Sequence, residues 1–341
     1  MKTKALSLLG LMVLGWGCNP KDPVEAVAEG NFISSVSETT KANGEEVTDL
    51  RNYLYDERMR LKEINYARRS GTASTLNQFS VENKQVFSYS NNDLLTIKTE
   101  TEVIDERAGD QKSKTQKQIT TNYNYLNGLL TEEMMQQVTV KSNSSVTKTL
   151  KTTYDYDANA KLRKKTTVDE TGTQRVWVFE NGLLTDYVER AANGAETHPF
   201  LIKNGLIEKV VYTDGNFGVY EYDAELHLTK FTLYVSAEGK INHYYTMGWS
   251  TGKSHELALP AFKGHPILPD FNGKKGILTH FDFYAEVNGK LVQLNDSNYK
   301  NEFYEDGFVK NTVLENNQFG TAPTDPVSVA TVSTVYRYLG K

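Results

Sequence analysis

Residues 123–130 read YNYLNGLL and contain the unit on which the fold prediction depends. Its two tyrosines are two residues apart, a spacing that places both rings on one face of a β-strand. Asn127 and Gly128 then supply the positive φ angles that a two-residue hairpin turn requires. Two apolar residues begin the next strand. The stretch therefore predicts the junction of two antiparallel strands.

The same pattern recurs along the chain and marks an internal repeat. The copies are 53–56 (YLYD), 87–92 (FSYSNN), 154–157 (YDYD), 177–184 (WVFENGLL), 200–207 (FLIKNGLI), 220–223 (YEYD), 303–309 (FYEDGFV) and 336–338 (YRY). A repeat that holds two strands and two turns predicts sequential pairing. We predict an all-β fold, a long antiparallel up-and-down meander of about 16–20 strands. Its sheet is either curved and open or a closed barrel that does not span a membrane.

The polar strands argue against a sheet that crosses a membrane, because such strands need an apolar lipid-facing side. Residues 131–139 (TEEMMQQVT) and 161–168 (KLRKKTTV) place polar side chains on both faces. Residues 45–69 fit a helical stripe as well as the repeat. We favour strands there, because 53–56 matches the other copies.

Composition supports a sheet and excludes one class of partner. The chain has 20 tyrosines, whose rings cover a sheet while their hydroxyls reach water. Pro199 alone lies between Pro23 and Pro260, as expected of long hydrogen-bonded ladders. The formal net charge is −5, which is unfavourable for contact with phosphate backbones. We expect no binding of nucleic acid.

The amino terminus predicts export and lipidation. Residues 1–17 combine two lysines, a short apolar run and small residues, as in a secretory signal peptide. The single cysteine, Cys18, follows directly, and this arrangement resembles a bacterial lipobox. The resemblance implies that Cys18 carries the lipid (palmitate). With Asn19 next, it also implies an outer-membrane anchor, with surface exposure left open. Residues 18–45 are then a flexible tether, and 46–341 form a single β domain.

The Tyr-x-Tyr-Asp units resemble the tyrosine-aspartate repeats of the RHS/YD class. Together with the lipobox they resemble Bacteroidetes outer-membrane lipoproteins of unknown function described as having a porin-like fold. The resemblance covers most of residues 50–341. It implies a curved or closed β-meander, and it carries over no catalytic residue.

The repeat lapses between Tyr245 and Tyr304, and a Pro/Gly-rich interruption occupies about 246–280. Irregular segments on a regular scaffold often carry function. Three interpretations stay open: a packed cap over one end of the sheet, a ligand-binding loop and a metal site. The candidate ligand contacts are Trp249, Phe262 and His265, through ring stacking and hydrogen bonding. The histidine spacing matches no metal motif, so we expect neither a metal nor a cofactor.

Catalytic motifs are missing from the sequence, including the serine elbow and the phosphate loop. The acidic pairs Glu132/Glu133 and Asp155/Asp157 are interpreted as solvated turn residues rather than a glycosidase pair. We therefore expect a non-catalytic envelope protein that binds or scaffolds through its sheet, docking onto another envelope protein. The alternatives are a glycan-binding lipoprotein of a polysaccharide-uptake system and, less favoured, a hydrolase.

Overall fold

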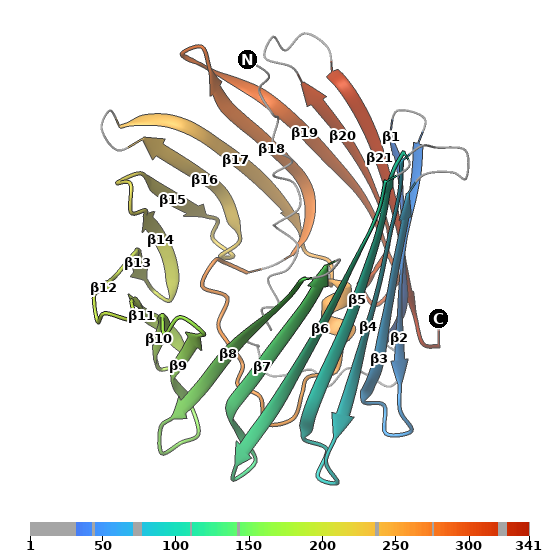
Figure 1. Ribbon diagram of the computed structural model, residues 1–341. Helices are drawn as coiled ribbons and strands as arrows, with labels where there is room; N and C mark the ends of the chain where they lie inside the picture. Colours follow the sequence, from blue (N-terminus) through green and yellow to red (C-terminus); the bar gives the residue numbers. More distant parts are fainter. Residues whose placement is uncertain are drawn as a thin grey trace.

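A computed structural model describes residues 32–340 except 43–44, 71–76, 110, 142–143, 236–238, 275 and 320–325. It contains one antiparallel sheet of 21 strands (Figure 1). The strands are β1 (Ile33–Ala42), β2 (Glu45–Tyr55), β3 (Leu61–Ser70), β4 (Asn77–Tyr89), β5 (Leu95–Ala108), β6 (Gln111–Leu126), β7 (Leu129–Lys141), β8 (Ser144–Tyr156), β9 (Leu162–Asp169), β10 (Gln174–Glu180), β11 (Leu183–Arg190), β12 (Glu196–Thr197), β13 (Phe200–Lys203), β14 (Leu206–Val211), β15 (Phe217–Tyr222), β16 (Leu228–Val235), β17 (Lys240–Ser250), β18 (Ile277–Val287), β19 (Lys290–Phe303), β20 (Val309–Phe319) and β21 (Pro326–Tyr338). The predicted all-β meander is confirmed.

Neighbouring strands in sequence are neighbours in the sheet, which curves until β21 pairs with β1 (Figure 1). Among the described strands the series of ladders is interrupted once, because β11 pairs with β12 but not with β13. β12 and β13 are separated by His198 and Pro199, and proline has no backbone N–H to donate. Side chains span this seam instead, with the rings of Tyr187 and Phe200 4.7 Å apart. The sheet is therefore not closed.

The turns of the repeat follow two designs. In the first, an Asn-Gly pair adopts positive φ, as at Asn127 (φ 52°) and Gly128 (φ 81°). In the second, an aspartate organises the turn through its side chain. Oδ1 of Asp56 accepts from the backbone N–H groups of Arg58 (2.9 Å) and Arg60 (3.0 Å). The aspartate of the Tyr-x-Tyr-Asp units thus stabilises the turn that follows its strand.

A β-bulge follows these turns and recurs with the repeat. After the turn at 127–128, Leu130 pairs with Tyr125 and Glu132 with Asn124, so that Thr131 is the extra residue. Its Oγ1 donates to the carbonyl of Asn124 at 3.1 Å. Three other threonines at equivalent positions make the same bond, namely Thr96, Thr185 and Thr229. Because a bulge interrupts the regular ladder, the residue before the bulge can direct its backbone N–H and C=O groups to partners outside the strand pair.

Two boundaries of the sequence prediction change. β1 (Ile33–Ala42) lies within the segment predicted as a tether, so the sheet begins earlier than residue 46. These residues form a strand because they lie between β2 and β21, and the backbone of β1 pairs with both of these strands. Residues 45–69, ambiguous in the sequence, form strands as favoured. The interruption narrows to residues 251–276, because β17 continues to Ser250 and β18 begins at Ile277.

The two faces of the sheet differ. Repeat aromatics such as Tyr53 and Phe87 lie on the concave face, where they pack in a core with Leu61, Leu95 and Ala258. The other face carries cross-strand ion pairs, including Lys84 with Glu63 and Lys151 with Glu132. Residues 32–340, apart from the gaps named above, include no helix that is long and apolar enough to cross a membrane.

Candidate functional site

The irregular residues 251–276, here called the rim segment, connect β17 to β18 along the concave side of one end of the sheet (Figure 1). This end, here called the repeat end, holds the turns at 56–60, 90–94, 127–128 and 304–308. The rim segment includes a short 3-10 helix, η2 (His255–Ala258), in which Ala258 is fully buried. Of the three interpretations, the packed cap describes this arrangement.

Backbone hydrogen bonds fix the rim segment to the repeat. Three of its carbonyls accept from N–H groups of residues that follow repeat turns. The bonds are Val309 to Lys253 (3.1 Å), Leu130 to Gly264 (2.8 Å) and Ile207 to Phe271 (2.8 Å). These donors are buried aliphatic residues. The repeat therefore presents matching N–H groups around the end of the sheet, and the rim segment uses three of them.

Carbonyls of buried residues at the strand starts, including those of the same three residues, accept from the repeat tyrosines. The second aromatic of a unit lies at the end of one strand, and its hydroxyl reaches the start of the preceding strand. The bonds are Tyr55 to Ile33, Tyr89 to Leu61, Tyr156 to Leu130 and Tyr222 to Ile207, each 2.7 Å, and Tyr338 to Val309 at 2.9 Å. These hydroxyls do not simply face water, contrary to the sequence interpretation. Burial raises the pKa of Tyr156 to about 12.

The three predicted ligand contacts occupy two separate places. Trp249 lies in β17, not in the loop, and its Nε1 donates to the carbonyl of Leu228 at 2.7 Å. It thereby plays the same part as the repeat tyrosines. Phe262 and His265 lie together in the rim segment, with ring centroids 5.4 Å apart. No contact within the described residues joins Trp249 to either of them.

His265 replaces one of the tyrosine-to-carbonyl bonds. Its Nε2 lies 2.8 Å from the hydroxyl of Tyr125, and its ring packs 5.2 Å from that of Tyr123. Burial lowers the pKa of His265 to about 4. The imidazole is therefore neutral at pH 7, and its Nε2 forms a hydrogen bond with the tyrosine hydroxyl. His255 lies 4.9 Å from the ring of Tyr336, and burial also lowers its pKa to about 4.

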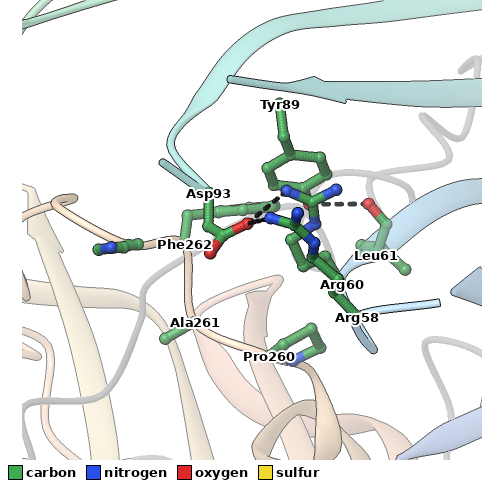
Figure 2. Close-up of a pocket in the computed structure, with 9 residues that line it drawn as sticks. Arg58, Arg60, Leu61, Tyr89, Asp93, Pro260, Ala261 and Phe262 are labelled. Atoms are coloured by element: carbon green, nitrogen blue, oxygen red, sulfur yellow. Dashed lines mark hydrogen bonds and ion pairs between the residues drawn. The ribbon is translucent and has the colours of Figure 1, made fainter. Parts of the chain in front are cut away.

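A small pocket opens where the rim segment meets two repeat turns (Figure 2). Its volume is about 150 Å³, and it is lined by Arg58, Arg60, Leu61, Tyr89, Asp93, Pro260, Ala261, Phe262 and Lys263. Phe262 is thus the one predicted contact that lines this pocket. The sequence analysis missed the charged residues, because they come from turns about 30 and 200 residues apart along the chain.

Ion pairs organise the pocket around Asp93. Arg58 Nη1 lies 2.8 Å and Arg60 Nη1 2.7 Å from its Oδ1. Arg60 also contacts Asp56 at 2.6 Å and covers the ring of Tyr89, 4.5 Å from the ring centroid. Hydrogen bonding to Arg58 lowers the pKa of Asp93. With Lys263 present, three cations face two carboxylates, and the pocket keeps a net positive charge.

The acidic pair Glu132/Glu133 is divided between the two faces of β7. Glu132 forms its ion pair with Lys151 on the convex face, 2.6 Å apart. Glu133 lies on the concave face, where it accepts from the hydroxyl of Tyr154 at 2.9 Å and burial raises its pKa. It is therefore not the solvated turn residue that the sequence analysis expected. Two carboxylates on opposite faces also cannot act on one glycosidic bond.

Two further predictions concern metals and the lipid anchor. Within the part of the chain that the structure describes, no group of three or more His, Cys, Asp or Glu side chains is arranged to hold a metal. His243 and His280 belong to β17 and β18 rather than to the rim segment. The predicted lipidation site, Cys18, and the signal peptide lie outside the described residues.

Comparisons with known proteins show a distant structural likeness. No family model matches the sequence, and no curated protein matches it. Among solved structures, the chain is similar to a porin-like protein from Bacteroides uniformis, at 14% identity, with 91% of this chain and 97% of that chain covered and a TM-score of 0.38. A likeness this distant carries no argument, so the fold rests on the strands and ladders described above.

Proposed function

We propose that the protein is a non-catalytic, lipid-anchored outer-membrane protein that docks onto another envelope protein through the convex face of its sheet. The observation that carries the proposal is the bonding of the rim segment. The longest irregular segment among the described residues, where a functional loop is expected, is instead fixed by backbone bonds to the repeat turns. The convex face then remains as a surface for a partner.

A small apolar group on the convex face supports this choice. Leu50 and Val335 flank Ser37 of β1 in the two ladders and are 40% and 39% exposed. Leu54, further along β2, is 47% exposed. Around them the face is polar, a combination typical of interfaces between separately folded partners.

The position of the anchor fits the same proposal. Cys18 precedes Phe32 by 14 residues, and a fully extended chain spans at most about 3.5 Å per residue. A lipid on Cys18 would hold the start of β1 within about 50 Å of the membrane. The apolar group on β2 and β21, which both pair with β1, would then lie on the part of the sheet next to the anchor.

The test is recovery of a partner from detergent-solubilised membranes with the full-length, tagged protein. A stoichiometric envelope protein should copurify with the unaltered chain and be lost in the variant Leu50→Glu with Val335→Glu. Leu201→Glu is the matched control, because Leu201 is 57% exposed on β13, remote from β1 in the sheet. A monomeric protein with no partner would contradict docking. In parallel, Cys18→Ser should abolish labelling by a palmitate analogue.

A glycan-binding function is the second candidate, and the pocket at Phe262 is the observation that favours it. Saccharides bind to proteins through aromatic rings combined with hydrogen-bond donors, and Phe262, Tyr89 and Arg58 provide both. Binding on a glycan array that Phe262→Ala abolishes would support this candidate. Trp249 is a poor probe, because its indole holds β17 to β16.

A further inference from the structure

We propose that the pocket between the β2–β3 turn, the β4–β5 turn and the rim segment binds a single oxyanionic group, a phosphate or a carboxylate. The inference does not rest on docking through the convex face, since the pocket lies on a different part of the molecule. It identifies the class of ligand and the side chains that would contact it.

Arg58 and Lys263 have more N–H donors than their bonds within the protein use. Arg58 has five N–H donors and its ion pair with Asp93 uses Nη1, while its side chain is 61% exposed. Lys263 has three N–H donors, one of which bonds the carbonyl of Asn92 at 3.0 Å. Both side chains can therefore turn donors toward a ligand in the pocket. Planar guanidinium groups bind phosphate and carboxylate through paired hydrogen bonds.

The third cation of the pocket, Arg60, is already fixed in position by its neighbours. Arg60 is held by an ion pair with Asp56. It is also paired with Asp93 and lies over the ring of Tyr89, whose hydroxyl is in turn bonded to Leu61 (Figure 2). Its charge is therefore preorganised in the lining of the pocket. A ligand would not have to immobilise this side chain, and this lowers the entropy loss on binding.

The volume of the pocket and its apolar lining also fit an oxyanion on an organic group. A volume of about 150 Å³ equals about five water molecules, which suits one oxyanion and the atoms next to it. Phe262 and Pro260 line the pocket beside the cations (Figure 2). They provide an apolar surface for the carbon atoms that carry the anion. A phosphate or carboxylate on an organic group thus fits better than a small halide.

Substitution of Asp93 should change the affinity for an anion in the opposite direction from substitution of the cations. Its carboxylate is the acidic side chain that lines the pocket, and it repels an entering anion. Asn preserves most of its geometry and tolerates the positive φ of 65° at this position. Asp93→Asn should therefore strengthen anion binding, while loss of the cations should weaken it.

The experiment uses the full-length lipidated protein in nanodiscs of phosphatidylcholine, with phosphorus NMR line broadening of added inorganic phosphate as the probe. The variant Arg58→Gln with Lys263→Gln should bind phosphate at least about tenfold more weakly, because it loses charge-assisted hydrogen bonds. Asp93→Asn should bind at least about threefold more tightly. Lys300→Gln is the control, because Lys300 is also exposed and paired, with Glu315 on the convex face, and should change nothing.

A second arm identifies the source of the anion. If a lipid headgroup occupies the pocket, nanodiscs that contain phosphatidylglycerol should abolish the broadening of the phosphate line by the unaltered protein. If the ligand is soluble, the broadening should persist there and glucose 6-phosphate should reduce it. Either result supports an oxyanion site. The proposal is overturned if the unaltered protein does not broaden the phosphate signal, or if the Arg58/Lys263 variant binds phosphate as the unaltered protein does.

Discussion

The neutral His265 beneath the repeat predicts a specific loss of stability in acid. Burial holds its pKa at about 4 in the folded protein, whereas an exposed histidine titrates near 6.5. Between these values the unfolded chain binds a proton that the folded chain does not. The stability contributed by the neutral imidazole is complete above about pH 6.5 and is lost as the pH falls toward 4.

The magnitude follows from the two pKa values. At pH 4.5 the unfolded histidine is almost fully protonated and the folded one is mostly neutral. The difference amounts to about 2.5 kcal/mol of unfolding free energy relative to neutral pH. Solvent access to this half-buried ring makes that an upper value. The reference is His265→Gln, whose amide oxygen can still accept from Tyr125 but does not titrate.

The assay is urea unfolding of both proteins at pH 7.5 and 4.5, followed by tyrosine fluorescence. Other groups titrate in this range, among them Glu133, whose raised pKa acts in the opposite direction. Because both proteins keep those groups, the contributions of the groups to the unfolding free energy cancel in the comparison. The unaltered protein should lose about 2 kcal/mol more than the variant on acidification. Equal losses would refute the buried, neutral state of His265.

Two further predictions concern the sheet itself. Tyr156→Phe and Tyr222→Phe each leave a buried carbonyl without its hydroxyl donor and should lower the unfolding free energy by about 1–2 kcal/mol in urea. Tyr234→Phe, where the ring stacks on its neighbour, should change it by less than half as much, and equal effects would contradict the role of the hydroxyl. Pro199→Thr restores a backbone donor at the seam and should slow amide exchange at residues 186–188. Unchanged exchange there would show that proline is not what separates β11 from β13.

The repeated strand ends could be predicted from sequence, because local chemistry determines them. Asn-Gly pairs and the aspartate after Tyr-x-Tyr specify turns within a few residues, and the aromatic spacing specifies the face. Residues 45–69 were recognised as strands for the same reason. The sequence does not reveal the significance of Pro199: an isolated proline indicates unbroken ladders, yet Pro199 lies where the series of ladders stops.

The candidate site could be predicted only in part, because it depends on contacts between distant turns. The interruption of the repeat located the rim segment, and Phe262 within it lines the pocket. Arg58, Arg60 and Asp93 belong to turns that look like ordinary solvated loops in the sequence. Their convergence follows from the even spacing of strands around a curved sheet. Trp249 was misplaced because β17 extends further than the repeat pattern indicated.

The rim segment crosses the repeat end of the sheet and forms the pocket there. Lys263 Nζ lies 3.0 Å from the carbonyl of Asn92, 171 residues away in sequence. In a Cys18→Ser background, the pair Asn92→Cys and Lys263→Cys should therefore be joined rapidly by a short bismaleimide. Lys263→Cys with Asn193→Cys, in a turn at the other end, should not be joined. If the first pair fails to cross-link although both thiols react with a monofunctional maleimide, the rim segment does not cross the repeat end as described.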